Sequence, residues 1–153
     1  MSECLFPVIH SLPSGEALIE KVLPEYPISK PYRCCLHKRG LNDTYRVETD
    51  AEPYILRIYR SCWRSKAEID FELELLTFLH QQRLPVAYPI ATKQGSFTEV
   101  IIAPEGKRYI ALFSYAPGRA VNEKLEPEES RKLGMALAQI HQTTDDFNSH
   151  LSR

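Results

Sequence analysis

The sequence lacks the short motifs by which most catalytic classes are recognised. Its six glycines lie far apart, so it holds neither a G-x-G-x-x-G fingerprint nor a Walker A loop. Its five histidines form no H-E-x-x-H pair, and no spacing of cysteine and histidine suits zinc. A G-x-S-x-G nucleophile elbow is also missing. Most familiar catalytic classes are therefore excluded.

The chain also lacks a dominant charge and a long apolar run. Nineteen Lys and Arg stand against twenty Asp and Glu, a formal net charge of −1, which favours neither nucleic acid nor a membrane surface as partner. No apolar run reaches the ~20 residues of a membrane span. The N-terminus shows no secretory signal, and the four cysteines form no C-x-x-C pair. We therefore expect a cytoplasmic protein with reduced thiols.

The order of predicted elements indicates an α+β fold. The 153 residues, 43% hydrophobic and 25% charged, suit one soluble domain. Short connections between the first three predicted strands favour an antiparallel meander, with the long helix as the return connection. The predicted elements are a short helix (14–23), three strands (32–39, 44–49 and 54–60), a long helix (65–82), two or three strands (88–92, 98–103 and 108–115) and a helix from Pro127.

Two charged residues stand out on elements that otherwise bury apolar side chains. In the strand 54–60 (YILRIYR), alternation places Arg57 on one face with two large neighbours. A guanidinium held there needs a carboxylate or a phosphate as partner. Glu72 borders the apolar stripe of the helix 65–82, from where its carboxylate could reach Arg57. Alternatively, Arg57 reaches water from an edge strand, and Glu72 is an ordinary solvated helix acid.

Two further patterns carry weaker signals. The turn 40–43 (GLND) could direct backbone N–H groups towards a phosphate, although a single glycine in a hairpin is more often only a turn. Basic and aromatic residues mix over 57–66, a pattern that also occurs in proteins that bind nucleic acid. The net charge of −1 favours a solvated strand end instead.

Five segments occur in an order typical of one family. They are GLNDTYRV (40–47), YILRIYR (54–60), EIDFELELLTFLHQQRLPVAYPI (68–90), RYIALFSYAPGRAV (108–121) and LGMALAQIHQT (133–143). Together they resemble the aminoglycoside phosphotransferase family of kinase-like enzymes, most closely its bacterial stress response Ser/Thr kinase type. The resemblance implies a protein-kinase-like N-terminal lobe, in which a twisted antiparallel sheet of about five strands packs against a helix C equivalent.

The resemblance also implies a division of the chain and a ligand. Residues 1–30 would be an N-terminal extension with a short helix, and 31–115 the small, nucleotide-binding lobe. Residues 116–153 would hold the hinge and the first helix of an incomplete large lobe. The implied ligand is ATP, bound as Mg-ATP.

Six residues would contact the nucleotide or position a residue that does. Gly40 and Asn42 would belong to the loop that covers the phosphates. Arg57 would hold the α- and β-phosphates in place of the usual lysine, and Glu72 would position Arg57.

The adenine base would lie against the hinge. Backbone groups at about Ser114 and Ala116 would bind its edge. The side chains expected to form the walls around the base are those of Val47, Ile55 and Ile90.

The sequence departs from the family after the hinge. The family carries an H-G-D-x-H-x-x-N catalytic loop and a D-x-D or D-F-G metal motif, yet no histidine here precedes Gly-Asp. Asp146-Phe147-Asn148 imitates D-F-G, but no catalytic loop precedes it, so we interpret it as coincidence. We therefore expect a nucleotide-binding lobe that is inactive alone, with no catalytic or metal-ligating residue of its own.

Two functions remain open. The chain is either part of an enzyme whose large lobe is encoded separately or lost, or a non-catalytic module that binds nucleotide weakly or docks on a partner. The last helix carries an apolar stripe of Leu133, Ala136, Leu137 and Ile140. In both cases we expect residues 127–153 to fray, fold back on the small lobe, or drive self-association. The acceptor, whether aminoglycoside, small alcohol or protein Ser/Thr, would be selected by the other half.

Overall fold

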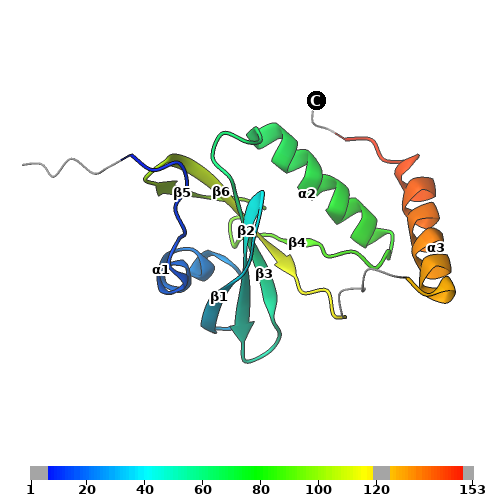
Figure 1. Ribbon diagram of the computed structural model, residues 1–153, viewed down its shortest axis with the longest axis horizontal. Coiled ribbons are helices and arrows are strands. Elements are labelled where there is room, and N and C mark those ends of the chain that lie inside the picture. Colours follow the sequence, from blue (N-terminus) through cyan, green and yellow to red (C-terminus); the bar gives the residue numbers. More distant parts are fainter. Residues whose placement is uncertain (1–6, 119–124, 150–153) are drawn as a thin grey trace, which may run out of the picture.

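The protein is an antiparallel sheet with one helix on each face and a third helix at its end (Figure 1). The computed structural model describes residues 7–118 and 125–149. The predicted α+β fold is confirmed, with six strands in the order β1-β2-β3-β6-β4 and β5 paired to β6. The elements are α1 (Gly15–Lys21), η1 (Leu23–Glu25), β1 (Pro31–Arg39), β2 (Asn42–Thr49), β3 (Tyr54–Tyr59), α2 (Lys66–Gln81), β4 (Pro89–Ile90), β5 (Glu99–Ala103), β6 (Gly106–Ser114) and α3 (Pro127–Thr144).

The first three strands form the predicted meander. In β2 every second residue is buried, as expected for a strand with one face on a core. The edge strand β1 buries only Cys34, which explains its poor hydrophobic alternation. Gly15, at the start of α1, lies so close to the Cys34 carbonyl that a β-carbon there would clash with the backbone. A side chain at position 15 would therefore push α1 away from β1.

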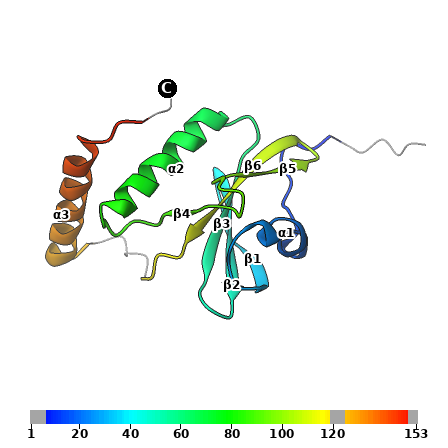
Figure 2. The same cartoon turned by 180° about the vertical axis from the view of Figure 1, so that it is seen from behind.

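Each face of the sheet has its own apolar core. On the α1 side, Leu56 and Leu112 pack with Leu18 of α1. On the α2 side, Ile69 and Leu73 pack against Phe113 and a further group of side chains from β3 and β6. The two helices lie on opposite sides of the strands in both views (Figures 1 and 2). The central strands β3 and β6 are therefore covered on both faces.

Local signals define both ends of α2. The Ser65 hydroxyl accepts from the Glu68 N–H, and the Glu68 carboxylate accepts from the Ser65 N–H, a capping box that starts the helix as predicted. After the helix, Arg83 adopts a positive φ of 63° before Pro85. These signals define where α2 begins and ends, and Glu72 lies in its second turn.

The helix α3 buries none of its described side chains. Of the expected apolar stripe, Leu133 and Leu137 are 49% and 47% exposed, whereas Ala136 and Ile140 are partly buried. The segment after α3 contacts α2, where the Phe147 ring lies 5.7 Å from Phe71 and 5.1 Å from Phe78. Folding back, one of the three expected outcomes, thus occurs through Phe147.

No helix among residues 7–118 and 125–149 is long and apolar enough to cross a membrane.

Candidate functional site

A cleft of about 450 Å³ opens beside the turn between β1 and β2. Four of the six predicted site residues, Gly40, Asn42, Arg57 and Glu72, line it. The remaining lining residues are Lys38, Leu41, Thr44 and Arg64. The structure therefore brings the turn, the strand arginine and the helix glutamate together.

The predicted ion pair between Arg57 and Glu72 is confirmed. Arg57 Nη1 donates to Glu72 Oε1 at 2.5 Å, and Arg64 Nη1 donates to Oε2 at 2.9 Å. Arg57 faces α2 because alternation in β3 turns Leu56 and Ile58 towards the opposite core. Glu72 thus holds the Arg57 side chain from above while leaving it 31% exposed to the cleft.

Aromatic rings support the Arg57 guanidinium. Its carbon lies 4.6 Å from the centre of the Phe113 ring and 5.9 Å from that of Tyr59. Burial, with a further contribution from the negative charge of Glu72, raises the pKa of Tyr59 to about 12. Tyr59 is therefore neutral at physiological pH and serves as packing for the guanidinium.

The charge of the cleft suits a polyanion. Lys38, Arg57 and Arg64 supply three cations among its lining residues, and Glu72 supplies the one carboxylate. The side-chain oxygen of Asn42 is buried and has no hydrogen-bond partner within the described residues. An arginine fork can bind two phosphate oxygens at once, so a phosphate chain matches this arrangement chemically.

The two predicted hinge residues, Ser114 and Ala116, differ in whether their polar groups are already hydrogen-bonded within the protein. The Ser114 N–H donates to the Tyr88 carbonyl at 2.9 Å, and its hydroxyl accepts from the Tyr88 N–H at 3.1 Å. The Ser114 N–H is thus already used within the protein. Ala116 is exposed beyond the end of β6. Neither residue lines the 450 Å³ cleft.

Two of the expected adenine walls, Val47 and Ile90, lie on the face of the sheet opposite to Arg57. Val47 is fully buried on the α1 side of the sheet, and Ile90 packs against the same core. Only Ile55 packs on the α2 side. The residue opposite Ile55 in β2 is Arg46, whose guanidinium carbon lies 5.1 Å from the centre of the Tyr115 ring. Thr44 pairs with Arg57, so alternation along β2 places Arg46, two residues further, on the same face of the sheet as Arg57 and Ile55.

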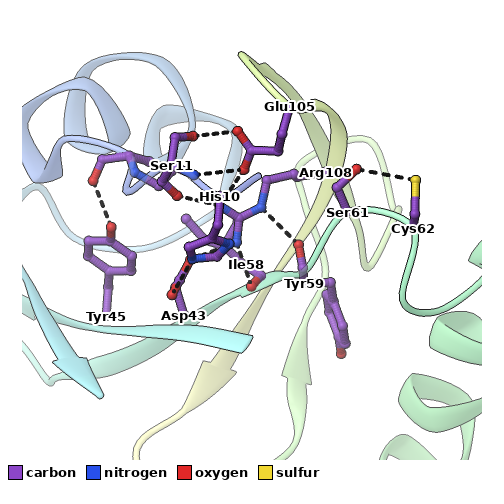
Figure 3. Close-up of polar contacts among 11 residues, drawn as sticks. His10, Ser11, Asp43, Tyr45, Ile58, Tyr59, Ser61, Cys62, Glu105 and Arg108 are labelled. Carbon is purple, nitrogen blue, oxygen red and sulfur yellow. Dashed lines mark hydrogen bonds and ion pairs between the residues drawn. The ribbon is translucent and has the colours of Figure 1, made fainter. Parts of the chain in front are cut away.

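A buried charged cluster lies on the other face of the sheet (Figure 3). Arg108 is fully buried, and its Nη2 donates to Asp43 Oδ2 at 2.7 Å. The guanidinium also donates to backbone carbonyls of Ser11, Ile58 and Tyr59. Sequence reasoning missed this cluster, although alternation with Ile110 and Leu112 would have placed Arg108 on the buried face.

The N-terminal segment closes over this cluster (Figure 3). His10 Nε2 lies 3.0 Å from Asp43 Oδ2. The Ser11 N–H and hydroxyl donate to the Glu105 carboxylate at 3.1 and 2.7 Å. Tyr45 donates its hydroxyl to the Pro13 carbonyl at 2.7 Å. Residues 10–13 are thus fixed to the sheet by polar contacts.

Acid should loosen this attachment through Glu105. Burial raises the pKa of Glu105, but hydrogen bonds from Ser11 and the Arg108 charge outweigh it, so the folded pKa lies below the ordinary 4.5. A depressed folded pKa gives stability that is present above about pH 4.5 and is lost as the pH falls through the folded value. We expect urea unfolding to show this loss in the wild type and a smaller loss in Glu105→Gln. Equal acid sensitivity of the two proteins would contradict the assignment.

The Arg57–Glu72 pair should contribute little to stability despite its short distance. Both side chains are partly exposed, and Glu72 is shared with Arg64. We expect a double-mutant cycle with Arg57→Ala and Glu72→Ala to give a coupling of about 0–1 kcal/mol. The exposed pair Arg131–Glu128 on α3 provides the matched control cycle. A coupling above about 3 kcal/mol, typical of buried pairs, would contradict the expectation.

Comparison with known proteins agrees with this geometry. The fold and the paired arginine and glutamate are those of the N-terminal lobe of a kinase-like phosphotransferase. The model of the Phosphotransferase enzyme family (APH) matches residues 36–152. The chain belongs to this family, which confirms the resemblance noted from its motifs.

Curated relatives extend well beyond this chain. The uncharacterized protein sll1119 of Synechocystis sp. is 45% identical over 148 residues, which are 97% of this chain and 41% of that protein. The homoserine kinase of Parvibaculum lavamentivorans is 28% identical over 106 residues, or 69% of this chain and 31% of that enzyme. The chain therefore spans about two fifths or less of the length of these relatives.

Solved structures share the fold. An amicoumacin kinase, hAmiN, in complex with AMP-PNP, Ca²⁺ and Ami matches with a TM-score of 0.75 at 24% identity, covering 90% of this chain and 42% of that one. Spectinomycin phosphotransferase APH(9)-Ia, in complex with ADP and its antibiotic, matches with a TM-score of 0.63 at 18% identity, covering 87% and 39%.

Proposed function

We propose that this chain is the nucleotide-binding lobe of an ATP-dependent kinase of the APH family. One observation carries the proposal: Arg57 is held by Glu72 in a cationic cleft beside the turn at Gly40. In this proposal Gly40 and Asn42 cover the phosphates, and Arg57 binds the α- and β-phosphate oxygens through its fork. The bound nucleotides in the amicoumacin and spectinomycin kinases support ATP as the ligand class.

The base would lie towards the hinge. Ala116 is exposed there and is the better candidate for an adenine contact, because the Ser114 N–H already donates to Tyr88. We keep the division into an extension (1–30), a small lobe (31–115) and a hinge with the first large-lobe helix (116–153) as part of the proposal. Such a kinase would work in the cytoplasm, and the free thiols of Cys34, Cys35 and Cys62 suit that compartment.

The magnesium that accompanies ATP has no assigned ligand in this chain. Among residues 7–118 and 125–149, no group of three or more His, Cys, Asp or Glu could hold a metal ion. Bound magnesium would neutralise charge on the transferring phosphate. The lobe's own residues would bind and orient the phosphate chain. We therefore propose that these 153 residues alone transfer no phosphate, because the sequence holds no H-G-D motif to supply a base.

Nucleotide titration tests the proposed function. A fluorescent ATP analogue should bind the purified chain, and Arg57→Ala should weaken binding about ten- to a hundredfold, the value of a charge-assisted hydrogen bond lost to alanine. Arg33→Ala, on the exposed face of β1, is the matched control and should bind normally. Absence of binding by the folded wild type, or equal affinity of Arg57→Ala and wild type, would refute the proposal. Mg-ATP turnover above a no-protein control would refute the inactivity of the isolated chain.

The exposed stripe of α3 favours a docking role as a second function. Leu133 and Leu137, one helical turn apart, are each about half exposed, and contiguous apolar surface of this kind marks an interaction site. The occupant we propose is a large lobe of the same kinase fold or, without it, a second copy of this chain.

Analytical sedimentation tests whether a second copy of this chain binds to α3. The isolated chain should self-associate as its concentration rises. The double variant Leu133→Glu, Leu137→Glu should stay monomeric, because the two charges resist burial in an apolar contact. A wild type that stays monomeric at every concentration would contradict self-association through α3.

A further inference from the structure

The turn that faces the cleft has no packing of its own. Gly40 has no neighbour within 4 Å of a β-carbon position, and Leu41 is 58% exposed. Asp43, two residues beyond this tip, is fully buried. The turn is therefore held by strand pairing, of Arg39 with Asp43 and of Asn42 with Tyr59, and by the side-chain contacts of Asp43.

Asp43 is placed to control the cleft residues on either side of it. Asn42 and Thr44 line the cleft, and strand alternation turns Asp43 to the opposite face. Since neighbouring residues of a strand share one backbone, a shift of Asp43 moves both cleft residues. The carboxylate thus acts as an anchor beneath the phosphate-facing surface.

Arg108 connects this anchor to the strand that carries Arg57. Its Nη2 donates to Asp43 Oδ2 at 2.7 Å, while Nε donates to the Tyr59 carbonyl at 3.0 Å. A weaker bond at 3.3 Å reaches the Ile58 carbonyl. One guanidinium therefore connects the start of β2, which lines the cleft through Asn42 and Thr44, with the end of β3, close to Arg57.

The N-terminal segment completes the anchor. His10 contacts Asp43, and the Ser11 carbonyl accepts from Arg108 Nη1 at 2.9 Å. Glu105, also in contact with Arg108, is held by Ser11. Two carboxylates and one guanidinium are thus shielded from water by residues 10–11. Apolar side chains of similar volume would fill this site without the desolvation cost of buried charges. The charged network therefore indicates that the geometry of the backbone here matters more than stability.

We propose that the Arg108–Asp43 pair, closed by His10 and Ser11, positions the phosphate-covering turn, so that the N-terminal segment controls affinity for the phosphates of the nucleotide. This inference rests on the proposed function of the Arg57 cleft. His10, Asp43 and Arg108 act as positioning residues, because none of them lines the cleft.

Affinities for ATP and AMP, measured by calorimetry, provide the first test. His10→Ala and Asp43→Asn should each weaken ATP binding about tenfold while changing AMP binding by less than about twofold. His37→Ala on the exposed strand β1 and Asp50→Asn in the opposite turn are matched controls, and both should bind like the wild type. Equal losses for ATP and AMP, or no loss of either, would overturn the proposal. If Asp43→Asn fails to fold, the ATP and AMP affinities of His10→Ala are sufficient to test the proposal.

Amide exchange tests the positioning without any ligand. In His10→Ala, exchange should accelerate at residues 42–44 and stay unchanged at residues 110–113 of β6. Unchanged exchange at 42–44 would overturn the positioning role. If the folded wild type binds no ATP, the proposed function fails, and the exchange result still decides whether the N-terminal segment holds the turn.

Discussion

Replacing Arg108 by methionine is expected to lower the free energy of unfolding by about 3–5 kcal/mol, because it leaves the Asp43 carboxylate buried without its cationic partner. Both side chains are fully buried, so solvent cannot compensate the carboxylate. The substitution also removes the donors to the Ile58 and Tyr59 carbonyls. Urea unfolding at neutral pH, followed by circular dichroism, measures the loss.

Two further proteins control this prediction. Arg131→Met removes an exposed arginine from α3 and should change stability by less than about 1 kcal/mol. Adding Asp43→Leu to Arg108→Met should recover part of the loss, since the unpaired charge disappears as well. If Arg108→Met were as stable as Arg131→Met, the buried network would have no role in holding the sheet together.

The second large effect is expected at the contact between α2 and the sheet. Leu73 is 1% exposed and belongs to the core that includes Phe113. Leu73→Ala should cost about 2–5 kcal/mol through lost burial and the cavity left behind. Leu137→Ala on α3 is the matched control, because it removes the same atoms from a helical position that is 47% exposed. Its cost should stay below about 1 kcal/mol.

Leu73→Ala should also affect the candidate site. Glu72 precedes Leu73 in α2 and holds Arg57 from above. A helix that seats loosely would no longer keep this carboxylate at a fixed distance from the guanidinium. Nucleotide affinity should therefore fall with Leu73→Ala, measured where the variant is folded, and remain unchanged with Leu137→Ala. Equal affinities in the two variants would show that the ion pair tolerates movement of α2.

The ion pair between Arg57 and Glu72 could be predicted from the sequence because it depends on short-range patterns within one strand and one helix. Alternation in a strand has a period of two, and a helix has a period of 3.6, so the faces bearing Arg57 and Glu72 follow from neighbouring residues. The ends of α2 are likewise local, since Ser65 and Glu68 cap it within one turn. The expectation for Val47 came from the order of motifs, whereas counting faces along β2 places Val47 on the α1 side, as observed.

Local sequence patterns are therefore sufficient to predict the element order, the faces of β3 and α2, and the resemblance to a kinase small lobe. The contacts between distant segments follow only from how the strands and helices are arranged in space. Arg108 meets Asp43 across 65 residues and Ser11 across 97, while Phe147 returns to Phe71. Such contacts depend on strand order and register, in which β3 separates β2 from β6. The stability of this arrangement comes from many contacts in both apolar cores together. A short stretch of sequence is therefore not enough to predict which distant segments will meet.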